Sequence, residues 1–398
     1  MNDDDRDTEP FAAVGPQRSS PAAPRSSCRA ARVVHGRAGR RGWGVHRVGG
    51  ALVLGVLLMA GCSSVPRQND VPNEDALQAG RAFLDSYQDP DGRVVRRDQG
   101  GDTVSEGQAY AMLIAVGVRD QTRFDRSWTW SRSHLQQPSG LLAYLWKDDR
   151  VADASPAADA DSQTAWALAL AARQWPGHGY AAAGRTLAEA VADHEIAHDS
   201  TGRQVLAAGP WALGGHGAPV VVEPGYWAGP VTAALSELTG DGRWKALRDS
   251  QPAVLRQLAG TAHLLPPDWA HLGAGAPPSP VPAPAGGAPI GCALDGQRAL
   301  VWAALDPRTR DLAAAWWQRI RPTSLAAPLR RALDGSPAGT DTSPLASVAA
   351  AATAQAAGDT DARNQLLQLA SATSARYPTY YGSAWAALGP LLLTTNRY

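Results

Sequence analysis

The sequence has no net charge, few cysteines and no long apolar run, and each absence excludes a class of protein. Its 37 basic and 37 acidic side chains balance over 398 residues, so it has no nucleic-acid-binding or polybasic membrane footprint. Beyond Cys62 the only cysteine is Cys292, so an exported domain would have no internal disulfide and would depend on a large core. The nine histidines lack metal-ligand spacing, and no phosphate-binding glycine loop occurs. We therefore expect no cofactor, no metal and no nucleic-acid partner.

The N-terminal portion precedes the folded domain. Residues 1–47 are rich in Arg, Ser, Pro, Ala and Gly without apolar periodicity, which predicts disorder or absence from the mature protein. No Met follows Met1 before Met59, so a later start at a non-Met codon is an alternative. Candidate codons are those of Val33, Val34 and Val45.

A short apolar run, residues 48–60, follows three arginines and has the layout of a secretory signal. It is too short to span a bilayer. It leads into Ala60-Gly61-Cys62, which resembles a bacterial lipobox with Cys62 as the lipidated first residue of the mature protein. The alternatives are an ordinary cleaved signal peptide and twin-arginine export. We expect an exported lipoprotein with a signal at 48–62, a linker at 63–74 and a folded domain at 75–398.

From about Asp75 onward the pattern is helical almost throughout, and two kinds of helix alternate. Helices that are apolar on nearly all sides must be buried, and amphipathic helices can cover them. The apolar set is 107–118, 163–175, 227–238, 297–305, 345–357 and 381–393. The amphipathic set is 76–88, 121–135, 181–195, 241–258, 309–320 and 360–375. This alternation predicts an all-α fold, an α/α toroid of six hairpins (α/α barrel), in which parallel inner helices gather their N-termini at one rim.

Glu106 is a lone acid in the first turn of an otherwise apolar helix. One interpretation is structural, because Thr103 and Glu106 have the spacing of a capping box. The other is a catalytic acid, whose carboxyl needs an apolar site to raise its pKa, with Tyr110 as an aromatic wall. The positive end of the helix dipole opposes that shift, so burial or bound substrate must outweigh it.

Further carboxylates stand at the starts of two other apolar helices. Asp159 and Asp161 precede one of them, and Asp295 precedes another. A helix needs only one N-cap, so two aspartates at one start favour a chemical role for at least one of them. Asp295 is either an N-cap or a third carboxylate at the rim. Arg298, three positions later, can pair with Asp295 or bind sugar hydroxyls.

Trp is frequent, with 14 residues against 3 Phe, and indole rings stack on the apolar faces of sugars. Trp166 and Trp302 lie within apolar helices and are expected to be buried. Trp146 and Trp269 fall in apparent loops, which makes them better candidates for sugar platforms. Residues 273–289 are rich in Gly, Ala and Pro, which predicts a long loop or a disordered insertion.

Seven motifs occur in an order that resembles one enzyme family. They are Ser105-Glu106-Gly107-Gln108-Ala109-Tyr110, Tyr144-Leu145-Trp146, Asp159-Ala160-Asp161, Glu223-Pro224-Gly225-Tyr226, Pro267-Asp268-Trp269, Leu294-Asp295 with Arg298, and Tyr380-Tyr381. Over residues 75–393 the chain resembles glycoside hydrolase family 8, and most of all the bacterial endoglucanases associated with cellulose synthesis.

The resemblance implies an α/α barrel that cleaves β-1,4-linked glycans with inversion at the anomeric carbon. Glu106 would be the general acid, Asp295 the general base, and Arg298 would orient or charge-balance the base. Asp159 would stabilise the distorted sugar, because an inverting pair needs a gap of about 6.5–9.5 Å for water and leaves no place for a nucleophile. The expected substrate-binding residues are Tyr110, Trp146, Tyr226, Trp269, Arg298, Tyr380 and Tyr381.

Some positions depart from the family pattern. Glu223 and Gly225 replace the Asn and Ser expected around Pro224, and Leu294 replaces an aromatic residue. These departures keep a non-catalytic glycan-binding lipoprotein open as an alternative. A substrate such as chitosan, mixed-linkage β-glucan or xylooligosaccharide is another, and an α/α toroid with unrelated chemistry is a third. The leading expectation is a monomeric endo-β-1,4-glucanase that acts on a β-linked polysaccharide and touches the membrane only through its lipid anchor.

Overall fold

The computed structural model describes residues 73–398 except 216, 274, 285 and 286. The predicted extension, the signal with Cys62 and the linker as far as residue 72 therefore lie outside the described residues. The first helix begins at Glu74, one residue before the expected domain start. Within the described part of the chain, no helix is both long enough and apolar enough to cross a membrane.

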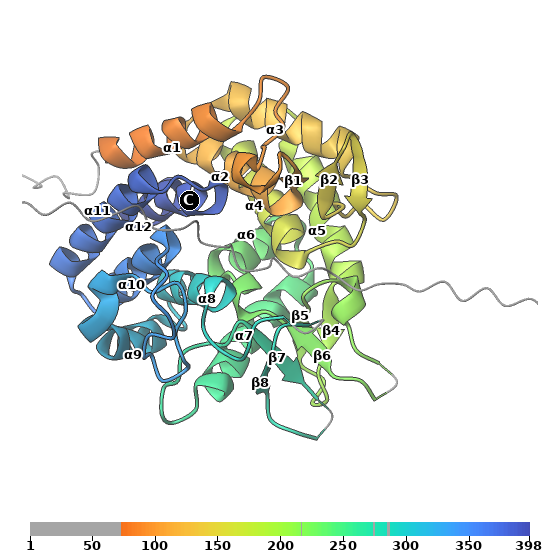
Figure 1. The fold of residues 1–398 in the computed structure, drawn as a ribbon. Coiled ribbons are helices and arrows are strands. Elements are labelled where there is room, and N and C mark those ends of the chain that lie inside the picture. The colour runs from red at the N-terminus through yellow and green to blue at the C-terminus, as the bar shows by residue number, and fades with distance from the viewer. Residues whose placement is uncertain (1–72, 216, 274, 285–286) are drawn as a thin grey trace, which may run out of the picture. The chain divides into compact units, whose positions relative to one another are not determined.

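Twelve α-helices occur in the described residues, and they follow the predicted alternation (Figure 1). The inner helices are α2 Ser105–Val118, α4 Ala158–Gln174, α6 Gly229–Thr239, α8 Leu294–Leu305, α10 Pro344–Ala356 and α12 Tyr380–Thr394. The outer helices are α1 Glu74–Tyr87, α3 Gln121–His134, α5 Tyr180–His194, α7 Gly242–Ala259, α9 Arg310–Ile320 and α11 Thr360–Arg376. Each inner helix contacts the next, and α12 contacts α2, so the inner ring closes. The predicted α/α toroid is confirmed.

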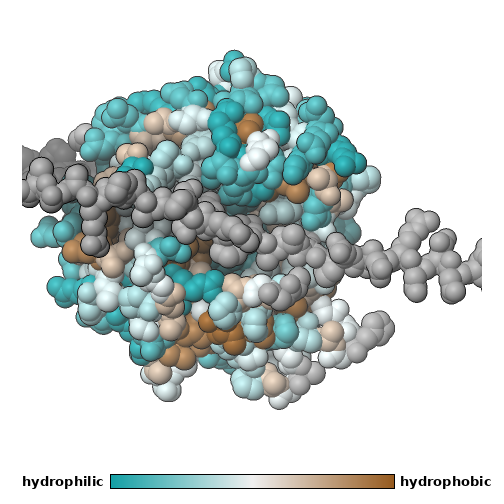
Figure 2. Space-filling view, in the orientation of Figure 1, coloured by the Kyte–Doolittle hydropathy of each residue, from teal (hydrophilic) through white to brown (hydrophobic). Residues whose placement is uncertain are grey.

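The difference between the two rings follows from their side chains. Every residue of α2 except Glu106 is buried. The outer helix α3 buries only one face, which includes Phe124 and Trp128. Figure 2 shows mainly hydrophilic residues over this side of the molecule, with hydrophobic residues confined to smaller areas. Amphipathic helices thus cover a core that apolar helices fill.

Aromatic contacts and shared contacts to Arg298 relate the inner helices to one another. Tyr110 and Trp385 are each the sixth residue of their helix, and their ring centroids lie 5.6 Å apart. Trp166 and Trp302 are each the ninth residue of theirs, and their centroids lie 6.4 Å apart. Both of the latter are buried, as predicted. Glu106, Asp159 and Asp295 are each the second residue of α2, α4 and α8, and all three contact Arg298, so the N-termini of these helices lie at one end.

The connections at that end are long, except residues 377–379 between α11 and α12, and several of them carry small antiparallel sheets. Their strands are β1 Thr103–Val104, β2 Leu145–Lys147, β3 Arg150–Asp153, β4 Ile196–His198, β5 Gln204–Leu206, β6 Val220–Val222, β7 Trp269–Leu272 and β8 Ser279–Val281. The sheet orders are β1-β2-β3, β4-β5 and β6-β7-β8. Trp146 and Trp269 therefore lie in strands, and the loop expectation for them was wrong. The expectation for 273–289 was also wrong in part, because β8 forms there as an edge strand that tolerates Pro280.

Candidate active site

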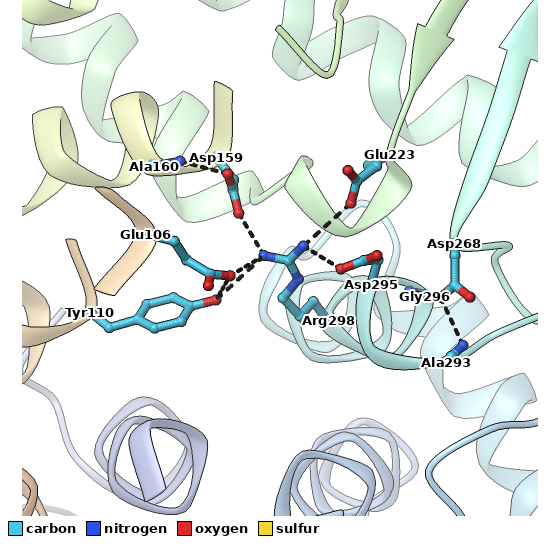
Figure 3. Close-up of polar contacts among 10 residues, drawn as sticks. All are labelled: Glu106, Tyr110, Asp159, Ala160, Glu223, Asp268, Ala293, Asp295, Gly296 and Arg298. Carbon is cyan, nitrogen blue, oxygen red and sulfur yellow. Dashed lines mark hydrogen bonds and ion pairs between the residues drawn. The ribbon is translucent and has the colours of Figure 1, made fainter. Parts of the chain in front are cut away.

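Arg298 is the centre of the candidate site, and four carboxyl groups surround its guanidinium (Figure 3). Its Nη1 donates to Glu106 Oε1 at 2.8 Å and to Asp159 Oδ2 at 2.6 Å. Its Nη2 donates to Asp295 Oδ1 at 2.7 Å and lies 3.4 Å from Glu223 Oε2. The predicted pairing of Arg298 with Asp295 is therefore confirmed. The guanidinium joins carboxyls that come from α2, α4, α8 and the residue after β6.

Burial separates these four carboxyls into two kinds. The side chains of Glu106 and Asp295 are 18% and 31% exposed. Those of Asp159 and Glu223 are each only 3% exposed, like that of Arg298 itself. The groups expected to act as acid and base thus reach solvent, and the other two lie beneath them.

Glu106 has the electrostatic surroundings that a general acid needs. Burial raises the pKa of its carboxyl to about 7, although the positive charge of Arg298 opposes this shift. The negative charges of Asp159 and Asp295 act in the same direction as burial. The Tyr110 hydroxyl donates to Glu106 Oε1 at 2.9 Å and holds the side chain in place. A carboxyl with this pKa still carries its proton in weakly acidic solution.

The capping-box interpretation of Glu106 is wrong. The N-cap of α2 is Val104, which provides no side-chain hydrogen bond. The Thr103 hydroxyl donates to the carbonyl oxygen of Val94 and accepts from Arg93, so it is not available to the helix. Glu106 is therefore free of a capping role.

The two aspartates of α4 have different tasks. Asp159 Oδ2 binds Arg298, and its Oδ1 accepts from the amide of Ala160. Asp161 turns away and accepts from the amide of Leu142 at 2.8 Å. The N-cap interpretation fails for both, because the N-cap of α4 is Ala157. Asp159 is the one that faces the site, and burial raises its pKa.

The start of α8 is fixed by an aspartate from a distant segment. Asp268 Oδ1 accepts from the amides of Ala293 and Gly296, at 2.8 and 2.7 Å. Asp295 is therefore not the N-cap of its helix, and its carboxyl is available to Arg298 and to solvent. Burial, together with the charge of Asp295, raises the pKa of Asp268 to about 7. Asp268 thus anchors the turn that carries Asp295.

The small sheets bring two tryptophans next to the segments that carry the carboxyls. In the β1–β2 pair, Trp146 lies opposite Thr103, three residues before Glu106. Val222 pairs with Ala270 in the β6–β7 sheet, so the register puts Trp269 next to Glu223. Both indoles are partly exposed, as a sugar platform requires.

The predicted tyrosines do not all line the surface. Tyr110 and Tyr380 are 0% and 1% exposed, so the structure places both beneath the site and corrects their expected position. Tyr380 packs against Phe83 and Tyr87 in the core. Two tyrosines remain partly exposed. They are Tyr226, whose ring lies 5.1 Å from the Arg298 guanidinium, and Tyr381, which packs against Tyr110.

Three residues of the site were missed as site residues in the sequence. Glu223 and Asp268 lie in quoted motifs but had no assigned role, and only their place beside Tyr226 and Trp269 was a signal. Trp211 is 42% exposed and its ring lies 6.1 Å from that of Trp269, which extends that platform. Its short turn carries no signal in the sequence. Among the described residues, no cluster of three or more His, Cys, Asp or Glu is arranged to hold a metal ion.

A model of the family described as "Glycosyl hydrolases family 8" matches residues 76–395. The chain belongs to this family. The match covers all twelve described helices except the first two residues of α1. The predicted family resemblance is confirmed.

Known relatives of this family 8 chain include endoglucanases. It is 31% identical to an endoglucanase from Cellulomonas uda over 207 residues, 51% of this chain and 57% of that protein. The alignment thus spans little more than half of that relative. A solved endo-beta-1,4-glucanase from Acetobacter xylinum matches with a TM-score of 0.68 at 24% identity, over 80% of this chain and 97% of that one. A beta-1,3-1,4-glucanase from Paenibacillus sp. X4 matches with a TM-score of 0.71 at 21% identity, over 82% and 93%. The two structures show the shared fold.

Proposed function

We propose that this chain is an inverting endo-β-1,4-glucanase, with Glu106 as general acid and Asp295 as general base. One observation carries the proposal: the two solvent-reaching carboxyls approach the Arg298 guanidinium from opposite ends (Figure 3). The endoglucanase relatives support the same reaction class.

The separation of the two carboxyls is compatible with inversion. The two Nη atoms share one carbon through bonds of about 1.33 Å, so Glu106 Oε1 and Asp295 Oδ1 lie no more than about 8 Å apart. Inverting pairs are separated by about 6.5–9.5 Å, which leaves room for one water between base and sugar.

In the proposed reaction, Glu106 gives its proton to the glycosidic oxygen as the bond to the anomeric carbon breaks. Water attacks that carbon from the opposite face, and Asp295 takes the proton that the water loses. The negative charge of Asp159 stabilises the positive charge that develops on the sugar ring in the transition state, and Arg298 orients Asp295 and Asp159 through its hydrogen bonds. Exchange with solvent then returns a proton to Glu106 and removes one from Asp295.

The substrate is proposed to be a glucan chain that lies across Trp146, Trp269 and Tyr226. ¹H NMR of cellohexaose hydrolysis tests linkage and stereochemistry together. We expect the α-anomer to appear first, as inversion of a β-linkage requires. Initial release of the β-anomer would contradict the mechanism. Tight binding without cleavage would favour the glycan-binding alternative, and faster cleavage of chitosan, mixed-linkage β-glucan or xylooligosaccharides would reassign the substrate.

We also propose that the chain is an exported, monomeric lipoprotein anchored through Cys62. The support is the apolar run 48–60 and the lipobox-like sequence after it. Metabolic labelling with an alkyne fatty acid in a bacterial host tests the anchor. Wild type should be labelled and Cys62→Ala should not. Equal labelling of both proteins would overturn the anchor and leave the glucanase proposal untouched.

A further inference from the structure

Glu223 is the carboxyl at Arg298 for which the proposed reaction has no task. It follows β6 and is 3% exposed, on the same side of the guanidinium as Asp295 (Figure 3). The turn that follows packs directly on α8, because a β-carbon at Gly225 would lie 2.1 Å from the carbonyl oxygen of Asp295. The close approach of Gly225 to α8 therefore holds Glu223 beside the helix that carries the base and Arg298.

The charges that face Glu223 leave it without a cation of its own. Asp295 and Arg298 face it from α8, Asp159 from α4 and Tyr226 from its own turn. The nitrogen it approaches, Arg298 Nη2, is already bound to Asp295 at 2.7 Å. One guanidinium serves four carboxyls here, and an additional buried negative charge would lose its hydration without a partner.

The contact lengths separate Glu223 from the other three carboxyls. Arg298 lies 2.6–2.8 Å from the carboxyls of Glu106, Asp159 and Asp295, as charge-assisted hydrogen bonds do. Its distance to Glu223 is 3.4 Å, which indicates a weaker contact. Burial, with the charge of Asp295, raises the pKa of Glu223 well above its ordinary value.

We propose that Glu223 is a positioning residue that works as a neutral carboxylic acid. It holds the Nη2 side of Arg298 toward Asp295 and adds no charge to the cluster. The hydrogen bond from the Tyr226 hydroxyl lowers the pKa of this carboxyl, but by less than burial raises it, and the Tyr226 ring covers the guanidinium. This assignment rests on the proposed function only for its kinetic consequences.

The kinetic test compares Glu223→Gln with Glu223→Leu over the pH profile of cellohexaose hydrolysis. Gln keeps the shape and neutrality of the protonated acid, so it should retain at least about half of the wild-type kcat, whereas Leu should lose about ten- to a hundredfold through misplacement of Arg298. The alkaline limb, set by Glu106, should not move in Glu223→Gln. A downward shift of that limb by more than about half a pH unit in Glu223→Gln would mean that Glu223 is ionised, and would overturn the proposal.

Infrared difference spectroscopy tests protonation without any hydrolysis. At pH 6 the spectrum of wild type minus Glu223→Gln should show the carbonyl stretch of a protonated carboxylic acid. A carboxylate band in its place would overturn the proposal, even if the protein cleaves no glucan. Conversely, the wild type could show the protonated-acid band and yet cleave no glucan. That result would support the neutral state of Glu223 and contradict only the glucanase proposal.

Glu195→Gln is the matched control. Glu195 is fully buried, burial raises its pKa well above its ordinary value, and no contact between it and Arg298 occurs in the described structure. This variant should also lose a protonated-acid band but should leave the kinetic pH profile unchanged. A kinetic change as large as that of Glu223→Leu would show that any buried acid has the same effect, and would contradict a specific role for Glu223.

Discussion

The two ends of the inner helices are built in opposite ways. At their N-terminal end, all connections but residues 377–379 are long, several carry sheets, and carboxyls gather around Arg298. At the other end the connections are short, such as residues 119–120 between α2 and α3. There Tyr398 donates to the carbonyl oxygen of Leu113 at 3.0 Å, and its ring packs 5.7 Å from that of Trp166.

The difference separates chemistry from stability. Helix N-termini carry partial positive charge and favour carboxylates, whereas the opposite ends present carbonyl oxygens that need donors. The N-terminal end, which we call the open end, concentrates charge that is costly to bury. The opposite end, which we call the closed end, is filled by aromatic packing around Tyr398. Substitutions at the two ends should therefore differ in kind as well as in size.

The largest effect should come from Arg298→Met, which removes the cation of the open end. Kcat should fall at least about a thousandfold, and stability should fall by about 3–5 kcal/mol because buried carboxylates lose their partner. The stability loss should be smaller at pH 5, where more of the carboxyls are protonated. Urea unfolding at pH 5 and pH 8 checks this, and an equal loss at both values would contradict the charge-based explanation.

Gly225→Ala should give the next largest effect. The added β-carbon would lie 2.1 Å from backbone oxygen, so the turn or the start of α8 must shift. We expect a loss of about 1–3 kcal/mol, as for overpacking, with a greater fall in kcat than change in KM. Gly100→Ala is a suitable control because open space surrounds that position, although its positive φ adds local strain. Equal kcat and KM in the two variants would show that the close approach of Gly225 to α8 does not affect the site.

The pH dependence of stability should reflect the open end. Glu106 and Asp268 have pKa values of about 7, above those of unfolded carboxyls. Between about pH 4.5 and pH 7 the unfolded chain has lost these protons while the folded protein keeps them, so stability must fall as pH rises. Urea unfolding at pH 5 and pH 7 should show a decrease of more than about 1 kcal/mol. An increase in stability from pH 5 to pH 7 would contradict the raised pKa values of Glu106 and Asp268.

The smallest effect should come from Tyr398→Phe at the closed end. Loss of the hydrogen bond to Leu113 should cost about 0.5–1.5 kcal/mol while the ring packing remains. Kcat and its pH profile should stay unchanged. Thermal unfolding and cellohexaose kinetics check both parts. Altered kinetics would show that the two ends are coupled.

The fold could be predicted from the sequence because its signal is local. Apolar and amphipathic helices differ within a single window, and Glu106 stood out as one acid in an apolar helix. Asp159 and Asp161 could not be told apart, because both lie in one helical turn. Tyr380 and Tyr381 point about 100° apart on α12, and periodicity alone did not decide which faces the site. The tasks of Glu223 and Asp268 depend on the pairing of strands far apart in the chain, which no local pattern records.

The most direct test of the central claim is the activity of Glu106→Gln on carboxymethylcellulose. The variant keeps the size of the side chain and removes the proton that the leaving oxygen requires. We expect reducing-sugar release to fall by about 10²–10⁴-fold at every pH, with an unchanged circular dichroism spectrum. Activity within a few fold of wild type would contradict the assignment of Glu106 as the general acid.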